Sequence, residues 1–156
     1  MKVLMAVDEP DTAMAVTDFV VGRKWAQGAE FIVLCVVVPP VVEPYVSFLP
    51  SGYLDELTEK HREIAGGIVE ACANKLMAVF PEAKVNKVVV EGLAYEEIMK
   101  RIALERPSLL VIGSHRNELT KQTVLSSAAR RLIFNSPCSA IVVKESGDNL
   151  FSAKNH

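Results

Sequence analysis

The chain has few of the residues that build metal or redox sites. Its 156 residues include only three cysteines and three histidines. The cysteines, Cys35, Cys72 and Cys138, lie far apart with no CxxC pair, and no histidine stands near them at the spacing of a metal ligand. We therefore expect no metal site, and we interpret each cysteine as a small buried hydrophobic residue.

The chain also lacks a cluster of positive charge and a long hydrophobic run. Seventeen lysines and arginines are scattered among nineteen acidic residues, which gives a formal net charge of -2 and no basic stripe for nucleic acid. The longest apolar runs have the length of strands, and the N-terminus enters a strand at once instead of showing the parts of a signal peptide. These features predict a soluble cytoplasmic protein that binds neither nucleic acid nor a membrane.

Motifs of catalysis are missing as well. The sequence contains no GxxxxGK[ST] loop that would place a lysine on nucleotide phosphates and no GxSxG nucleophile elbow. No cysteine has an identifiable adjacent base. His115 stands alone in an expected loop, where we interpret it as a hydrogen-bonding or exposed residue rather than a general base. The sequence therefore predicts a protein that is not an enzyme.

What the chain does contain is a regular alternation of strand and helix signals. Half of its residues are hydrophobic and 23% are charged, which suits one compact domain over residues 1–145 followed by a loose tail over 146–156. Repeated strand and helix units favour a parallel sheet covered by helices on both faces. We expect strands over 2–8, 30–38, 85–91, 109–112 and 139–143, and helices over 11–27, 54–79, 95–105 and from about 126 to 135.

Three local features of these elements carry further expectations. Asp11 or Thr12 can cap the first helix, and Gly28 is expected to end it. The second helix carries an apolar stripe at helical spacing, made of Leu57, Ile64, Ile68, Cys72 and Leu76. Gly66 and Gly67 inside that helix each cost roughly 1 kcal/mol relative to alanine, which suggests close packing at this point.

The segment from Pro39 to Gly52 is unusual because it combines four prolines with many apolar residues. Because its prolines prevent regular structure while its side chains are apolar, we expect this segment to pack over another part of the protein or over a ligand. It is either a flap that packs on its own domain or on a second subunit, or a lid over a ligand pocket.

The most informative segment begins with the apolar strand that ends at Ile112. Gly113 follows at once, which predicts a sharp turn with exposed backbone N–H groups where phosphates can dock. A loop and a helix come next, then Ser136-Pro137-Cys138 and the apolar strand that ends at Val143. This order resembles the C-terminal half of the universal stress protein family.

Other fragments extend the resemblance over nearly the whole chain. They are Val3-Leu4-Met5-Ala6-Val7-Asp8, Gly28-Ala29-Glu30, Gly92 and Glu96-Glu97-Ile98. The resemblance implies an α/β fold with an open five-stranded parallel sheet in the order 3-2-1-4-5, helices on both faces, and a Rossmann-like topology close to the adenine nucleotide alpha hydrolases. Ligands of such sheets bind outside the carboxyl ends of the strands, at the point where the strand order reverses.

The sequence departs from the family where phosphates would bind. Nucleotide-binding members have the pattern Gly, two residues, Gly, nine residues, Gly-Ser. Here the first glycine is Gly113, but the second position holds Arg116 and the third holds Ser126, followed by Ser127. If the second position needs a positive φ, a non-glycine residue costs about 1 to 2 kcal/mol, and the loop then changes shape.

The replacing residues have alternative roles. Arg116 can bind an anion through its guanidinium or stay solvated or paired at the surface. Ser126 and Ser127 can cap the last helix or add hydroxyl donors to a weak anion site that uses the N–H groups near Ala128. Arg116 and the two serines decide how much phosphate binding survives.

At the nucleoside end of the implied site, the sequence departs less from the family pattern than at the phosphate end. Asp8, at the end of the first strand, can accept hydrogen bonds from an amine or hydroxyl of a ligand, or it can serve as a turn residue that caps a helix or pairs with a cation. Val36 would line the base pocket, although a buried strand valine needs no ligand. The complete set of cofactor-binding residues that we expect is Val7, Asp8, Val36, Ile112, Gly113, Arg116, Ser126, Ser127 and Ala128.

The resulting prediction is a non-enzymatic universal stress protein that acts as a regulatory or protective module. It holds no cofactor tightly and binds phosphate, sulfate, AMP or ATP weakly at most. It forms a homodimer through Ile141, Val142 and Val143, and its protein partner is unknown. The alternative is an ATP-binding universal stress protein that acts as a nucleotide-dependent switch or slow ATPase, and a third possibility is a flavin or electron-transfer relative of the same topology.

Overall fold

The computed structural model describes residues 1–40 and 48–145. Five parallel strands form an open sheet in the order β3-β2-β1-β4-β6. They are β1 (Lys2–Val7), β2 (Glu30–Val37), β3 (Lys84–Glu91), β4 (Leu109–Arg116) and β6 (Ser139–Lys144). The predicted order 3-2-1-4-5 is confirmed, with β6 as the fifth predicted strand.

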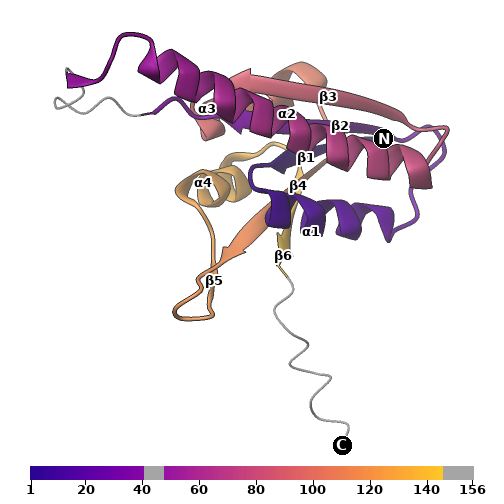
Figure 1. Cartoon of the computed structure of the whole chain (residues 1–156). Coiled ribbons are helices and arrows are strands. Elements are labelled where there is room, and N and C mark those ends of the chain that lie inside the picture. The colour runs from indigo at the N-terminus through magenta and orange to yellow at the C-terminus, as the bar shows by residue number, and fades with distance from the viewer. Residues whose placement is uncertain (41–47, 146–156) are drawn as a thin grey trace, which may run out of the picture.

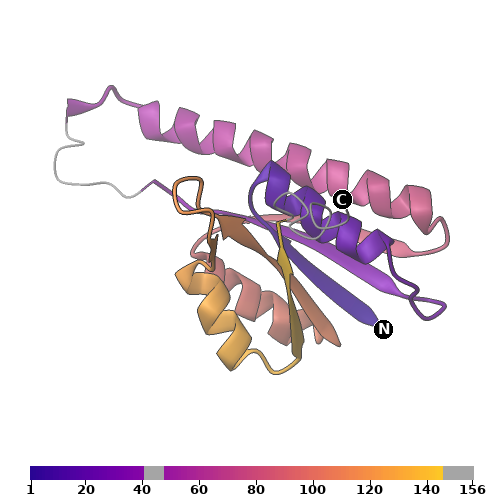
Figure 2. The same ribbon diagram turned by 90° about the horizontal axis from the view of Figure 1, so that it is seen from below.

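Helices cover both faces of this sheet, as expected. The helices α1 (Pro10–Val21) and α2 (Tyr53–Val79) lie on one face, and α3 (Ala94–Glu105) and α4 (Ser127–Asn135) lie on the other (Figure 1, Figure 2). The interior strand β2, which pairs with β3 and β1, is buried along almost its whole length because helices cover the apolar side chains on both of its faces. Two hydrophobic clusters result, one on each face of the sheet.

A further short strand, β5 (Thr123–Val124), was not predicted. It pairs antiparallel with the end of β4, so that His115 faces Val124 and Arg116 faces Thr123. The resulting hairpin projects away from the sheet beyond its carboxyl edge (Figure 1). The hairpin occupies the segment in which the sequence predicts a loop.

The first helix is shorter than predicted. It ends at Val21, where the N–H of Gly22 bonds to the carbonyl oxygen of Asp18. The indole of Trp25 donates to the carbonyl oxygen of Val20 at 2.8 Å and thereby closes the helix end. Gly28 therefore does not end the helix. It lies with φ 79° in the turn before β2 instead.

The expected capping of this helix is also wrong. Its N-cap residue is Glu9, with no side-chain hydrogen bond, and Pro10 takes the first position inside the helix. This arrangement suits proline, whose missing N–H would have no partner there. Thr12 lies inside the first turn and is buried.

The second helix buries only part of its predicted stripe. Ile68, Cys72 and Leu76 are buried, whereas Ile64 is 58% exposed. A Cβ added at Gly66 or Gly67 would meet no described atom within 4 Å. The expected close packing at the two glycines is therefore wrong in the described part of the chain.

The unusual segment Pro39 to Gly52 is described only at its ends. Residues 41–47, which contain most of its apolar side chains, lie outside the described residues, and so does the expected tail over 146–156. The flap and the lid therefore stay alternative predictions. Among the described helices, none combines the length and the apolar character that spanning a membrane requires.

Candidate functional site

A cavity of about 220 Å³ lies at the carboxyl ends of β1, β2 and β4, between the sheet and the helices α3 and α4. The strand order reverses between β1 and β4, so this is the switch point at which ligands of open α/β sheets bind. We call it the switch-point cavity. It is lined by Ala6, Val7, Asp8, Leu34, Val36, Val38, Ala94, Ile98, Ile112, Gly113, His115, Ser126, Ser127, Ala128, Ala129 and Leu132.

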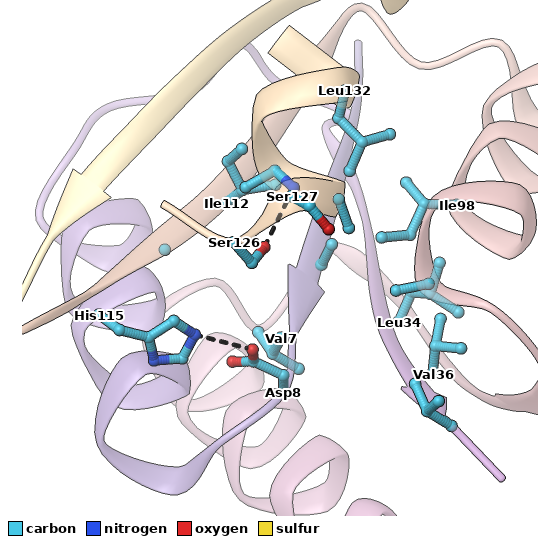
Figure 3. A pocket seen from close by; sticks show the side chains of 16 residues that line it. Val7, Asp8, Leu34, Val36, Ile98, Ile112, His115, Ser126, Ser127 and Leu132 are labelled. Carbon is cyan, nitrogen blue, oxygen red and sulfur yellow. Dashed lines mark hydrogen bonds and ion pairs between the residues drawn. The ribbon is translucent and has the colours of Figure 1, made fainter. Parts of the chain in front are cut away.

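One side of the cavity is an apolar wall. The wall brings together side chains from two strands and two helices (Figure 3): Leu34, Val36, Ile98, Ile112 and Leu132. All five belong to the hydrophobic cluster on the α3 and α4 face or pack against it. Because the core itself forms this wall, it offers a preformed apolar surface to a flat ligand such as a nucleobase.

Asp8, His115, Ser126 and Ser127 form a polar edge of the cavity, which lies across from Leu34, Val36 and Ile98 (Figure 3). Asp8 directly follows β1, and its Oδ1 accepts a hydrogen bond from the N–H of Glu9 at 2.8 Å. Its Oδ2 lies 3.0 Å from Nε2 of His115. Asp8 is thus both a turn residue and the partner of a neighbouring side chain, and 57% of its side chain is exposed.

His115 has partners on both ring nitrogens. Its Nδ1 lies 3.4 Å from Oγ1 of Thr12 and 3.5 Å from Oε2 of Glu9. His115 reaches these groups because β4 continues past Ile112 and carries the ring to the start of α1. The imidazole therefore stands between two carboxylates at the edge of the cavity.

Gly113 does not make the expected turn. The strand β4 runs through it, and Gly113 pairs in register with Val143 of β6. The next residue, Ser114, is fully buried and donates to the carbonyl oxygen of Val143 at 3.3 Å. Pairing with β6 keeps the backbone extended at this point, and pairing with β5 continues it through Arg116.

The physical reason for a glycine at this position is close packing against α1. A Cβ added at Gly113 would overlap Cγ2 of Thr12 and would lie 3.3 Å from Cγ2 of Val16. The predicted turn at Gly113 is wrong, because the glycine lies inside β4 and permits α1 to cross the strand closely. Phosphate docking at this segment stays a prediction.

Arg116 lies on the hairpin and does not line the cavity. It has no positive φ, since Arg106 and Lys121 are the non-glycine residues with positive φ in the described chain. The strain considered for a non-glycine residue therefore does not arise. Its Nε is buried without a hydrogen-bond partner within residues 1–40 and 48–145.

The start of α4 forms the remaining part of the polar edge. Ser126 is the N-cap, and its Oγ accepts a hydrogen bond from the N–H of Ala129 at 3.1 Å. The first N–H groups of a helix have no partner within the helix, which leaves those of Ser127 and Ala128 available at the cavity. The capping alternative for Ser126 is thus the one that the structure adopts.

The structure brings most of the expected site residues together. Eight of the nine line the switch-point cavity, and Arg116 does not. His115, which the sequence predicts to be a hydrogen-bonding or exposed loop residue, also lines the cavity, although it is not among the expected site residues. His115 stands two residues beyond Gly113, and residues two apart on an extended strand lie on the same face of the sheet. An expectation that β4 continues past Gly113 would therefore have placed His115 on the same face as Gly113.

The cysteines behave as hydrophobic residues rather than as ligands. Cys35 and Cys72 are buried on the α1 and α2 face, and Cys138 is partly buried. Burial, and to a smaller extent Asp8 and Cys72, raise the pKa of the Cys35 thiol to about 11. In the described residues, no three histidine, cysteine, aspartate or glutamate side chains gather as metal ligands would.

The sheet order and the cavity at its switch point define an α/β protein of the Rossmann-like class. Residues 1–144 match the model of the universal stress protein family, and the chain belongs to this family.

Individual relatives agree with this assignment. Universal stress protein MJ0577 of Methanocaldococcus jannaschii is 26% identical over 152 residues, which cover 92% of this chain and 94% of the relative. The solved structure of MJ0577 has a TM-score of 0.75 at 27% identity and covers 94% of this chain and 96% of its own.

Two more distant solved structures share the fold. Universal stress protein UspA from Lactobacillus plantarum has a TM-score of 0.72 at 19% identity, covering 92% of this chain and 97% of its own. A family protein from Arabidopsis thaliana, solved with AMP bound, has a TM-score of 0.67 at 14% identity, covering 95% and 94%.

Proposed function

We propose that this chain is a non-enzymatic, dimeric universal stress protein module whose switch-point cavity binds adenosine or AMP weakly and gains little from further phosphates. The observation that carries the proposal is the cavity itself, where an apolar wall faces the Asp8 carboxylate across the carboxyl ends of the strands. AMP in the related Arabidopsis structure supports an adenine nucleotide as the ligand class.

The size of the cavity favours the nucleoside part of such a ligand. Pockets for small molecules usually measure about 300 to 1,000 Å³, whereas the switch-point cavity measures about 220 Å³. Leu34, Val36 and Ile98 can pack against a base, and Asp8 can accept hydrogen bonds from an amine or a ribose hydroxyl. Phosphates would then extend along the polar edge toward α4.

The polar edge offers phosphates less than the family pattern would. Ser126 uses its own Oγ to satisfy the N–H of Ala129, so this helix donor is no longer free for an anion. Arg116 and its neighbours pair with β5, which holds the backbone N–H groups of this segment in a hairpin. Both observations support weak binding of a triphosphate.

Calorimetry with adenosine, AMP and ATP tests the proposal. We expect dissociation constants near millimolar, with ATP bound no more than about threefold more tightly than AMP. A factor of three means that the additional phosphates contribute less than about 0.7 kcal/mol, since 1.4 kcal/mol is a factor of ten. Asp8→Ala should abolish the remaining binding, whereas Asp11→Ala, an exposed acidic residue outside the cavity, should leave it unchanged. Micromolar ATP binding by the wild type would overturn the proposal.

A double substitution tests whether the replaced glycines are responsible. If Arg116 and Ser126 cost roughly 3 to 4 kcal/mol of ATP binding, Arg116→Gly with Ser126→Gly should tighten ATP binding from millimolar toward micromolar. Asp8→Ala in that background should weaken it again. An unchanged affinity for ATP would assign the loss to the shape of the β4 and β5 hairpin instead.

The alternative function is an ATP-dependent switch or slow ATPase. The observation that favours it is the start of α4, where the N–H groups of Ser127 and Ala128 border the cavity and can hold an anion. Nucleotide that co-purifies with the protein, released by denaturation and measured by its absorbance, would support this alternative. Hydrolysis of ATP that disappears in the Asp8→Ala variant would support the ATPase.

The dimer is proposed from the edge strand β6. It pairs with β4 on one side, and no other described strand pairs with its second side. Ile141 and Val143 pack on one face of the sheet and Val142 on the other, all within an apolar strand whose free edge invites pairing. A second copy of this strand would extend the sheet across the two subunits.

Sedimentation analysis tests the dimer. The wild type should show twice the monomer mass, and Val142→Lys should lower it, with circular dichroism used to verify that the variant is folded. Lysine substitution of the exposed Leu119 is the control and should leave the mass unchanged. A wild type that stays monomeric at high concentration contradicts the proposed dimer.

A further inference from the structure

A second cavity, of about 250 Å³, lies at the amino ends of β2 and β3, at the opposite edge of the sheet from the switch-point cavity. It is lined by residues 25–29, by Phe31 near the start of β2, and by residues 79–83, which connect the end of α2 to β3. We call it the amino-edge cavity. The two cavities share no lining residue, so the proposed function makes no use of this one.

Three of the residues that line the amino-edge cavity are aromatic. Phe31 is fully buried, and the ring of Trp25 meets it edge-on with 5.8 Å between the ring centroids. The ring of Phe80 stacks on Phe31 at 5.5 Å. Trp25 and Phe80 are only partly buried, so part of each ring can contact a ligand. An apolar cavity of about 150 Å³ is large enough to hold a benzene ring, which makes a ligand with a single aromatic ring suitable in size.

Hydrogen bonds within the protein fix the two lining segments. The N–H of Ala29 donates to the carbonyl oxygen of Ala26 at 3.1 Å, and the N–H of Ala83 donates to that of Phe80 at 3.0 Å. The indole N–H of Trp25 is bonded to a carbonyl oxygen of α1, which orients the ring and leaves its N–H engaged. The cavity is therefore preformed, and a ligand would order few side chains when it binds.

The charge at this cavity selects the kind of aromatic ligand. Of the lining side chains, only that of Glu82 carries a charge, and it is exposed. The nearby cations are engaged elsewhere, since Lys84 pairs with Glu30 at 3.4 Å and the guanidinium of Arg23 lies over the ring of Phe19. An unpaired carboxylate beside aromatic faces favours a positive charge, because both attract a cation.

We propose that the amino-edge cavity binds a small aromatic molecule that carries a cationic amine. The ring of the ligand packs against Trp25 and Phe80, and its ammonium group lies beside the carboxylate of Glu82. The ring supplies most of the affinity because it leaves water, whereas an exposed ion pair adds only a small factor. This site is independent of the proposed function and can be tested without a nucleotide.

The fluorescence of Trp25 provides a direct measurement, because this residue is the only tryptophan of the chain. Phenethylamine is the probe, since its ring does not absorb at the red edge of the tryptophan band where Trp25 is excited. We expect a saturable change in the emission of Trp25 with a dissociation constant near millimolar. Phenethyl alcohol, which has the same ring without the charge, should bind about threefold more weakly.

Three variants locate the probe in the cavity. Glu82→Gln should weaken binding of the amine about threefold and leave binding of the alcohol unchanged. Its matched control is Glu63→Gln, an exposed carboxylate on α2 outside the cavity, which should change neither. Ala26→Leu places a larger side chain at an exposed lining position and should weaken both probes about tenfold. Circular dichroism verifies that each variant is folded.

Three results would overturn the proposal. The first is an emission of Trp25 that does not change with phenethylamine up to about 10 mM. The second is equal affinity of the wild type for the amine and the alcohol, which would show that Glu82 selects no cation. The third is equal binding of the amine by the wild type and Ala26→Leu, which would place the probe elsewhere. If Ala26→Leu does not fold, the comparison of Glu82→Gln with Glu63→Gln decides, because both changes lie at exposed positions.

Discussion

The apolar wall and the polar edge of the switch-point cavity differ in what holds them in place. The wall consists of core side chains, such as Leu132, that pack between the sheet and the helices α3 and α4. The edge depends on single contacts, namely Asp8 to His115 and Ser126 to the backbone of Ala129. The wall therefore resists change because the fold depends on it, whereas the edge can lose or gain a ligand contact with little effect on folding.

Truncation of the wall should give the largest effect. Leu132 is 1% exposed, and Leu132→Ala should lower the free energy of unfolding by about 2 to 5 kcal/mol, because it removes buried methyl groups and leaves a cavity. Leu119→Ala, on the hairpin and 94% exposed, should change it by less than about 0.5 kcal/mol. Urea unfolding measures both. Equal effects would mean that a wall residue contributes no more to folding than an exposed residue of the hairpin.

The thiol of Cys35, buried on the face of the sheet that α1 and α2 cover, tests whether water reaches the protein interior near the ends of the strands. The pKa of Cys35 is raised from 9.0 to about 11, mainly by burial. A pKa that is higher in the folded state contributes stability that is complete below about pH 9 and is lost as the pH rises through about 11. Two units correspond to about 2 to 3 kcal/mol.

Unfolding of wild type and Cys35→Ala at several pH values measures this contribution. The difference in the free energy of unfolding between the wild type and Cys35→Ala should shrink between pH 9 and pH 11. Comparing the two proteins cancels the effect of other groups that titrate in this range. A constant difference between the two proteins over this range would show that the thiol is hydrated in the folded state.

Gly113 lies where the wall meets the edge, and alanine at this position tests its packing role. Gly113→Ala should lower the free energy of unfolding by about 1 to 3 kcal/mol, because the new Cβ overlaps Thr12. Thr12→Ser removes the overlapping methyl group and should restore most of the stability in the double variant.

Gly66→Ala is the matched control for Gly113→Ala. Gly66 lies within α2, and a Cβ added there would contact no described atom within 4 Å. Because alanine favours a helix more than glycine does, Gly66→Ala should stabilise the protein by roughly 0.5 to 1 kcal/mol. Thermal unfolding compares the two variants. If Gly113→Ala is as stable as the wild type, the close approach of α1 to β4 is not what requires a glycine.

The smallest effect is expected at the polar edge. Ser126→Ala removes the N-cap of α4 and should cost about 1 kcal/mol, while Ser126→Gly should cost only a few tenths. Urea unfolding of the two variants gives the difference. Equal stability of Ser126→Ala and the wild type would mean that the hydrogen bond to Ala129 contributes nothing, and the helix donor would then be free for an anion.

Much of the fold follows from local patterns. The near-continuous apolar run of β2 and the alternation of strands and helices are enough to predict a covered parallel sheet, and the resemblance supplied its order. Boundaries were less accurate. The first helix ends at Val21 because Trp25 folds back onto the carbonyl of Val20 and packs against Phe31, a contact between segments that periodicity does not contain.

The candidate site, like the fold, was predicted in part from the sequence. Residues that end a strand or begin a helix, such as Asp8, Val36 and Ser127, converge because all parallel strands end at one edge, so the sequence could predict their meeting. Their role in binding remains a prediction. The hairpin was missed because β5 has only two residues, and so short a strand is recognisable only from its partner.

The sequence by itself therefore determined the order of the elements along the chain and the two apolar faces of the sheet, since these follow from periodicity, and its resemblance to the family implied the strand order and a ligand site at the switch point. Only the tertiary structure decided the meaning of Gly113 and His115. Both lie on β4, whose continuation depends on pairing with β6 and β5, and their partners come from the start of α1, about a hundred residues away. Contacts across that separation depend on how the helix crosses the strand, and no local pattern contains this information.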